Sequence, residues 1–170
     1  MSHAENKVDW CLRKAEKELK GSGSHRGLVK TRPDLATARR HIRKAEHNLK
    51  AMSDFKGMGY SDWSASAAFY SIYHCLLAIT AKFGYESRNQ DCTFALIYKL
   101  IEDGMIDLDA ELIRSVHEMN AEEKQESSTI ISVRESQQYG VTLSLEDDTF
   151  NKMLRTVMVI LDRAKEVLEG

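Results

Sequence analysis

The 170-residue sequence has little of what marks several protein classes. It contains one proline and nine glycines, too few chain breakers for a turn-rich all-β fold. Its longest mostly apolar stretch, residues 65–83, is interrupted by Ser, Tyr, His and Thr, which makes it a poor membrane span and a good buried helix. The first twenty residues are mostly polar and do not resemble a signal peptide. We therefore expect a cytoplasmic protein that makes no membrane contact.

Cysteines are also few, and the common metal and nucleotide motifs are missing. The three cysteines, Cys11, Cys75 and Cys92, are odd in number and share no close spacing, which predicts no disulfide framework and a reduced, intracellular chain. The sequence has neither an HExxH pair nor a GxxxxGK[ST] or GxGxxG loop. We expect no metal site and no cofactor.

What the sequence does contain is the composition of an ordinary globular domain. Apolar residues make up 42% and charged residues 29%, which argues against disorder. The net charge of −2 hides an asymmetry, because residues 1–50 carry 13 Lys or Arg against 6 Asp or Glu, whereas residues 51–170 carry 11 against 20. A basic end on an acidic body permits contact with a polyanion, and equally self-association or an intramolecular dipole.

Apolar residues recur at three- and four-residue steps along most of the chain, which predicts an all-α fold. Residues 21–24, Gly-Ser-Gly-Ser, predict the start of a flexible linker that runs to Pro33. We therefore expect an N-terminal helix and linker over residues 1–33, and a helical bundle domain over residues 34–170. The predicted helices cover residues 4–20, 33–55, 62–83, 91–103, 109–119 and 147–168. Residues 120–145 are polar, lack clear periodicity and contain the β-leaning residues 129–133, which predicts mainly loop with at most a helical turn or two.

Four segments carry a family resemblance. They are RRHIRKAEHNLKAM (39–52), the small and aromatic SASAAFYSIYHCLLAITAKFGYES (64–87), RNQDCTFALIYKLIEDGMID (88–107), and VRESQQYG (133–140) before the last amphipathic helix. From about Arg39 onward the chain resembles the HEPN superfamily, in particular its small prokaryotic stand-alone members. The resemblance implies an up-and-down bundle of four to five helices, commonly dimeric. Many members are metal-independent ribonucleases, often toxins paired with a nucleotidyltransferase antitoxin, and others bind nucleotides.

The catalytic signature of that family is an Arg followed, after four to six residues, by a His. Here Arg134 is present, but Tyr139 stands where the His is expected. A tyrosine with an ordinary pKa of about 10 is a poor base at neutral pH, although it can donate a hydrogen bond to a phosphate. The resemblance thus implies a degenerate site in which Arg134 contacts phosphate and Tyr139 and Glu135 assist.

Basic residues in two other places are candidate phosphate contacts. Arg40, Arg43 and Lys44 form a cluster that suits phosphate, and it suits a solvated helix surface equally well. Arg88 and Asn89 precede a predicted helix whose first N–H groups suit an anion. Asn89 also suits the role of a simple N-cap.

The middle of the apolar helix carries a third set of candidates. His74 lies beside Tyr70 and Tyr73, and these three residues are predicted either to line a pocket or to be satisfied core residues. Two functions stay open. The first is binding of RNA or a nucleotide, with metal-independent cleavage through the 2′-OH if the site is active. The second is an inactive interaction module, homodimeric or paired with a nucleotidyltransferase-type partner.

Overall fold

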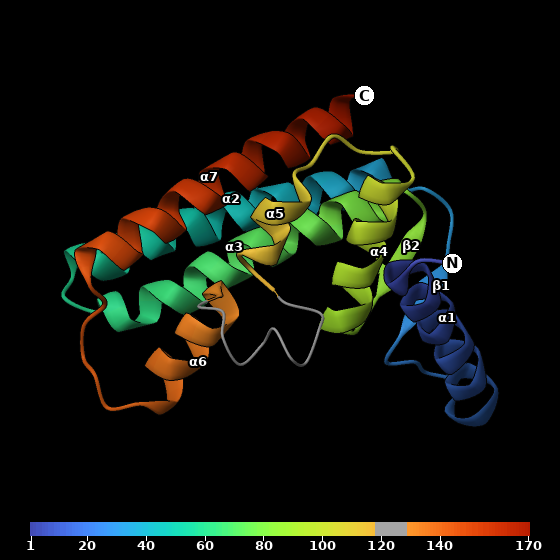
Figure 1. Ribbon diagram of the computed structural model, residues 1–170, viewed down its shortest axis with the longest axis horizontal. Helices are drawn as coiled ribbons and strands as arrows, with labels where there is room; N and C mark the ends of the chain where they lie inside the picture. Colours follow the sequence, from blue (N-terminus) through green and yellow to red (C-terminus); the bar gives the residue numbers. More distant parts are fainter. Residues whose placement is uncertain (118–128) are drawn as a thin grey trace.

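The computed structural model describes residues 1–117 and 129–170. Three long helices, α2, α3 and α7, run side by side, and α1 lies at one end with two short strands (Figure 1). The elements are α1 (His3–Ser22), β1 (Leu28–Lys30), α2 (Leu35–Gly57), α3 (Ser61–Lys82), β2 (Tyr85–Ser87), α4 (Gln90–Glu102), α5 (Ala110–Arg114), α6 (Ile130–Tyr139) and α7 (Asp147–Glu169). The architecture is the all-α helical bundle that the sequence predicts, because the strands are only three residues long.

Helix α3 forms the centre of the bundle, in contact with α2, α4, α6 and α7. Two buried serines of α3 form hydrogen bonds to α2. Ser64 Oγ donates to the Met52 carbonyl and Ser71 Oγ to the Ala45 carbonyl, each at 2.7 Å. By length and composition α3 could cross a membrane, but 72% of its most apolar window is buried inside the bundle. The burial of α3 in the core accounts for its apolar composition.

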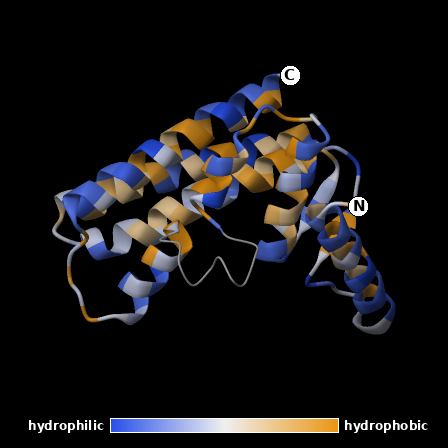
Figure 2. Ribbon diagram, in the orientation of Figure 1, coloured by the Kyte–Doolittle hydropathy of each residue, from blue (hydrophilic) through white to orange (hydrophobic). Residues whose placement is uncertain are grey.

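Helix α7 covers one side of α2 and α3 with an amphipathic surface. Its buried residues recur at three- and four-residue steps, whereas its other faces carry charge (Figure 2). The apolar stripe predicted from the sequence therefore faces the core. The buried members are Phe150, Met153, Val157, Ile160, Leu161 and Ala164.

The N-terminal segment is attached to the bundle by three kinds of contact. Helix α1 packs on α4, and β1 pairs antiparallel with β2, so the predicted flexible linker contains a strand. Cys11 of α1 and Cys92 of α4 form a disulfide. The prediction of a reduced chain without a disulfide was wrong, because the fold returns α1 to the start of α4 across 81 residues of sequence. Cys75 is the buried free cysteine.

The segment before the last helix is the other place where the structure differs from the prediction made from the sequence. Residues 130–139 form the helix α6, whereas the sequence predicts mainly loop there. Thr129 caps α6 by accepting a hydrogen bond from the Ser132 N–H at 3.1 Å, and Ile130 is buried. Helix α5 ends at Arg114, earlier than predicted, and the predicted helix end at position 119 lies outside the described residues.

Candidate functional site

Arg134 lies where α6 packs on α3, with its guanidinium over two aromatic rings. The guanidinium carbon lies 4.4 Å from the centre of the Phe69 ring and 5.8 Å from that of Tyr70. Only 12% of the Arg134 side chain is exposed, and Phe69 is fully buried. Stacking on an aromatic face holds the planar cation in a fixed orientation.

The charge of Arg134 is only weakly neutralised. Its Nη2 lies 3.8 Å from Glu135 Oε1, a carboxylate that is 57% exposed. Arg134 Nε is buried and has no hydrogen-bond partner within the described ranges, and the same holds for Gln137 Oε1, three residues further along α6. Because buried polar atoms are nearly always paired, an unused donor and an unused acceptor on one stretch of α6 distinguish this part of the helix from the rest of the described fold.

A pocket opens beside Gln137. It has a volume of about 150 Å³ and lies between the start of α3 and the end of α6. Gln137 lines it from α6, and Trp63 and Ser66 line it from α3. Trp63 is 55% exposed, so its indole offers a flat surface next to an unpaired amide oxygen. Aromatic surfaces of this kind stack on nucleobases.

Tyr139 is not placed to act together with Arg134. Five residues along a helix correspond to a rotation of about 140° from one face to another. Tyr139 is 79% exposed at the end of α6, whereas Arg134 faces α3. The structure therefore places Glu135 near Arg134, whereas Tyr139 points elsewhere, and the role of Arg134 and Glu135 at a phosphate stays a prediction.

His74 pairs with a residue that the sequence analysis did not select as a site. Its Nδ1 lies 2.9 Å from His41 Nδ1, and the ring centres are 5.2 Å apart. Burial is the first cause that lowers the pKa of His74, to about 4, and nearby His41 and Lys44 lower it further. The pKa of His41 is also lowered, by burial and by Arg40. Both rings are therefore neutral at neutral pH.

The predicted basic cluster is divided between two faces of α2. Arg40 and Lys44 flank the His41–His74 pair, as their effects on the two pKa values show. Arg43, together with Arg39, lines a groove of about 520 Å³ between α2 and α7. Arg40 and Lys44 are thus the members of the cluster that lie near the His41–His74 pair.

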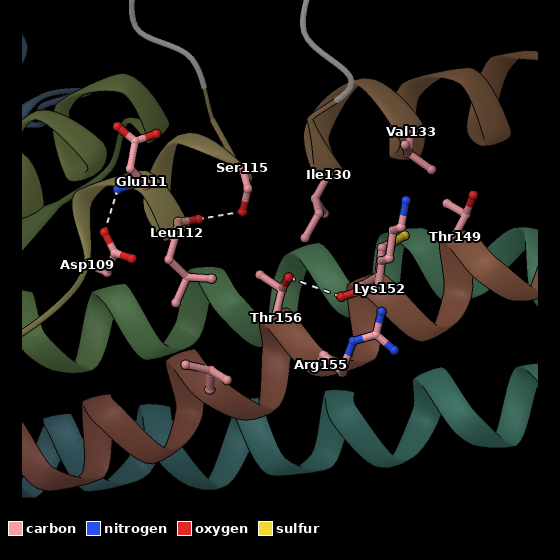
Figure 3. Close-up of a pocket in the computed structure, with 12 residues that line it drawn as sticks. Asp109, Glu111, Leu112, Ser115, Ile130, Val133, Thr149, Lys152, Arg155 and Thr156 are labelled. Carbon is pink, nitrogen blue, oxygen red and sulfur yellow. Dashed lines mark hydrogen bonds between the residues drawn. The ribbon is translucent and has the colours of Figure 1, made fainter.

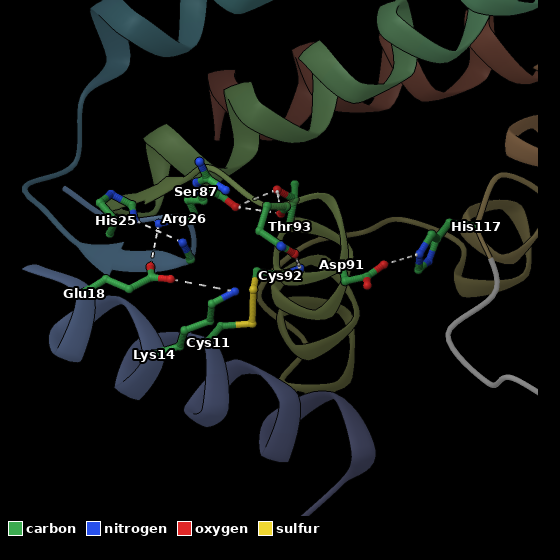
Figure 4. Close-up of a disulfide and its surroundings, with 12 residues drawn as sticks. Cys11, Lys14, Glu18, His25, Arg26, Ser87, Asp91, Cys92, Thr93 and His117 are labelled. Carbon is green, nitrogen blue, oxygen red and sulfur yellow. Dashed lines mark hydrogen bonds and ion pairs between the residues drawn. A yellow bond between two sulfur atoms is a disulfide. The ribbon is translucent and has the colours of Figure 1, made fainter. Parts of the chain in front are cut away.

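The predicted anion site at the start of α4 is occupied by the protein itself. Asn89 Oδ1 accepts the Cys92 N–H at 3.0 Å, which makes Asn89 the N-cap. Arg88 Nε donates to Glu86 Oε1 at 2.8 Å. The disulfide fills the same end of the helix (Figure 4). Tyr73 is likewise engaged, because its hydroxyl lies 3.1 Å from Thr93 Oγ1.

A wider pocket of about 640 Å³ lies between α5, α6 and α7 (Figure 3). Its lining combines the cations Lys152 and Arg155 with the carboxylates Asp109 and Glu111. This mixture of charge favours neither an anion nor a cation. The pocket contains none of the residues predicted from the sequence, and we assign no ligand to it.

The His41–His74 pair makes stability depend on pH. A His74 pKa of about 4 in the folded chain against 6.5 in the unfolded chain means that the unfolded state binds more protons as the pH falls. Stability is therefore full above pH 6.5 and declines between 6.5 and 4. Solvent screening at this half-buried ring reduces the effect to about 1–2 kcal/mol. Urea unfolding at pH 7.5 and 4.5 should show a smaller decline for His74→Gln than for the wild type, and equal declines would contradict this assignment.

Comparison with known proteins finds a family match that covers most of the chain. A family model described as "HEPN domain" matches residues 38–168. A protein of Archaeoglobus fulgidus named "UPF0332 protein" is 26% identical over 129 residues, which cover 75% of this chain and 91% of that protein. The matched region runs from α2 to α7 and leaves α1 and β1 outside. The boundary between an N-terminal segment and a bundle domain at residues 33 and 34 stays a prediction.

Proposed function

The chain belongs to the HEPN domain family, and this family is associated with functions that involve nucleotides or RNA. We propose that the protein binds single-stranded RNA where α3 contacts α6. The observation that carries the proposal is the Arg134 guanidinium, stacked on Phe69 with a buried, unpaired Nε. Such a group is an oriented cation with hydrogen-bonding capacity left over, which suits an RNA phosphate.

The neighbouring pocket supplies the other half of a nucleotide site. In this proposal the phosphate lies at Arg134, and the attached base enters the pocket further along α6, which Trp63 and Gln137 line. The indole stacks on the base, and the unpaired Gln137 Oε1 accepts from a base amino group. Single-stranded RNA fits this arrangement better than a duplex does, because its bases are free to leave the stack.

Replacing Arg134 tests this proposal. We expect Arg134→Ala to weaken binding of a fluorescently labelled RNA 20-mer by about tenfold or more, since a charge-assisted hydrogen bond contributes about 1.5–3 kcal/mol. Arg134→Lys retains the charge but not the planar guanidinium, so its RNA affinity should lie between those of the wild type and Arg134→Ala. Fluorescence anisotropy at several salt concentrations measures the affinity, and the salt slope should fall by about one in Arg134→Ala.

The matched control is Arg155→Ala, which removes an exposed cation from α7. Its RNA affinity should stay within about twofold of the wild type, because in this proposal Arg155 makes no contact with the RNA phosphates. Equal affinities of the wild type and Arg134→Ala would contradict the assignment of Arg134. A wild-type protein without affinity for RNA would favour the second function.

That second function is an interaction module, homodimeric or bound to a nucleotidyltransferase-type partner. It is favoured by exposed aromatic and apolar side chains around the start of α3, which are Met58, Tyr60, Trp63 and Tyr70. Exposed apolar groups that lie together mark surfaces for contact with other proteins. In this second proposal, the same Trp63 that faces the small pocket packs against a second chain.

A further inference from the structure

The groove of about 520 Å³ lies where the start of α2 meets the end of α7. These two helices run antiparallel, because the end of α2 pairs with the start of α7 through Lys56 and Asp147. Further along, Glu46 of α2 pairs with Lys165 of α7 at 2.6 Å. This second ion pair crosses between the helices just beyond the part of α2 that lines the groove. The groove therefore lies near the C-terminus, whereas α6 lies toward the other end of the bundle (Figure 1).

The apolar part of the groove is aliphatic. Ile42 is buried, and Leu168 is partly buried against the core. Leu35 adds an exposed apolar side chain from the start of α2. Among the described residues, no aromatic side chain lines the groove. Because nucleobases bind by stacking on aromatic groups, this lining suits an alkyl chain better than a nucleotide.

Two arginines without partners line the groove from α2. Arg39 and Arg43 are four residues apart and so share one face of the helix. Neither forms an ion pair or a side-chain hydrogen bond with any residue that the structure describes. Lys165 adds a third cation from α7, and the carboxylate of Glu169 is the anion in the described lining. The excess of positive charge favours an anion, and a guanidinium binds a carboxylate through two parallel hydrogen bonds.

Charge and apolar surface are separated along the groove. Arg43 and Leu35 are eight residues apart, which corresponds to about 12 Å along α2. Because α7 runs antiparallel, Lys165 lies toward Arg43 and Leu168 lies toward Leu35. Glu169 belongs to the same end as Leu168, where its charge disfavours a second anionic group. The groove therefore fits a molecule with one anionic head and one aliphatic tail.

We propose that this groove binds a medium-chain aliphatic carboxylate. The carboxylate lies between Arg43 and Lys165, within reach of Arg39. The alkyl chain crosses Ile42 and extends toward the start of α2. The volume of the groove lies within the range of about 300–1,000 Å³ that is usual for small-molecule sites. A protein partner fits less well, because a stable protein interface takes about 20–30 residues a side and seven described residues line this groove.

This site is separate from the proposed RNA site, and each proposal can hold without the other. Isothermal titration calorimetry of octanoate into the full chain tests the new site. Octanoate should bind with a dissociation constant of about 1 mM, a moderate affinity for a ligand of about ten non-hydrogen atoms. Decanoate should bind up to about tenfold more tightly, because each buried CH₂ group improves affinity by up to about fourfold. Octylammonium has the same tail with the opposite charge and should not bind.

The arginines are tested by a double variant that combines Arg39→Gln with Arg43→Gln. Both side chains are exposed, so the variant should fold as the wild type does, and its affinity for octanoate should fall about fivefold or more. The matched control is Arg13→Gln, which changes an exposed arginine of α1 and should stay within about twofold of the wild type. Leu35→Gln should reduce the advantage of decanoate over octanoate, because Leu35 lies at the apolar end.

Three results would overturn this inference: no binding of octanoate or decanoate by the wild type, unchanged affinity in the double variant, or equal affinity for octylammonium. Arg134→Ala separates the new site from the proposed function. It should bind octanoate as the wild type does, even where its RNA affinity is lost. A loss of octanoate binding in Arg134→Ala would place the carboxylate at α6 and would remove the groove assignment.

Discussion

Truncating Phe69 to alanine should lower the free energy of unfolding by about 3–5 kcal/mol, the usual loss for a buried phenylalanine. Phe69 has no exposed surface, stacks on Tyr73 with the ring centres 5.8 Å apart, and supports the Arg134 guanidinium. The same change should weaken RNA binding, because Arg134 then loses the surface that orients it. Urea unfolding followed by circular dichroism measures the first effect, and anisotropy at a temperature where the variant is folded measures the second.

Phe94→Ala is the matched control for this prediction. Phe94 is also fully buried, but it stacks on His117, with ring centres 4.2 Å apart, instead of on Arg134. Its loss should destabilise the fold by a similar amount and leave the RNA affinity of the folded protein unchanged. If Phe69→Ala and Phe94→Ala reduced affinity equally, the role of Phe69 as a support for Arg134 would be refuted.

Breaking the disulfide between Cys11 and Cys92 should lower the free energy of unfolding by an amount comparable to that for Phe69→Ala. The bond closes a loop of about 80 residues, and the entropy of an unfolded chain with such a loop gives a stabilisation of about 4 kcal/mol. The bond reinforces the attachment of the N-terminal segment, since among the described residues α1 makes its larger contacts with α4 and β1. Cys11→Ala, or reduction of the wild type with dithiothreitol, should therefore lower the midpoint of urea unfolding.

Cys75→Ala separates the disulfide from a general thiol effect. Cys75 is free and buried, and its burial raises the pKa of the thiol to about 12. Dithiothreitol should still destabilise Cys75→Ala and should leave Cys11→Ala unchanged. Sensitivity of Cys11→Ala to dithiothreitol would show that the loop closed by Cys11 and Cys92 is not the source of the effect.

The bundle helices were predictable because their stability comes from amphipathic stripes that the sequence displays. The stripe from Phe150 to Ala164 is buried in α7, and Leu168 in the last turn packs against the core while partly exposed. Helix α6 was not predictable in this way. Its β-branched residues 129–133 carry no helical stripe, and its position depends on the Thr129 cap, the burial of Ile130 and the stacking of Arg134 on Phe69. Such tertiary contacts override local preference.

The residues of the candidate site also divide into those that the sequence indicates and those that depend on tertiary contacts. Arg134 was identified from a resemblance; the structure places it against α3, and its contact with phosphate stays a prediction. The His41–His74 pair was missed although a signal existed. His41 lies 16 residues before Gly57 and His74 lies 15 residues after Gly59, so a hairpin of antiparallel helices turning at these glycines brings the two histidines together. The disulfide had no such signal, because it depends on how α1 returns to α4.

The most direct measurement of the central claim is the NMR signal of the Arg134 side-chain Nε–H, assigned by its absence in Arg134→Lys. This donor is buried and unpaired in the free protein, so a phosphate that binds there changes its chemical environment strongly. Titration with a single-stranded RNA oligonucleotide should shift this signal with the same midpoint as the anisotropy curve, before the exposed arginines respond. An Arg134 signal that stays in place while RNA binds would show that the nucleic acid contacts another surface.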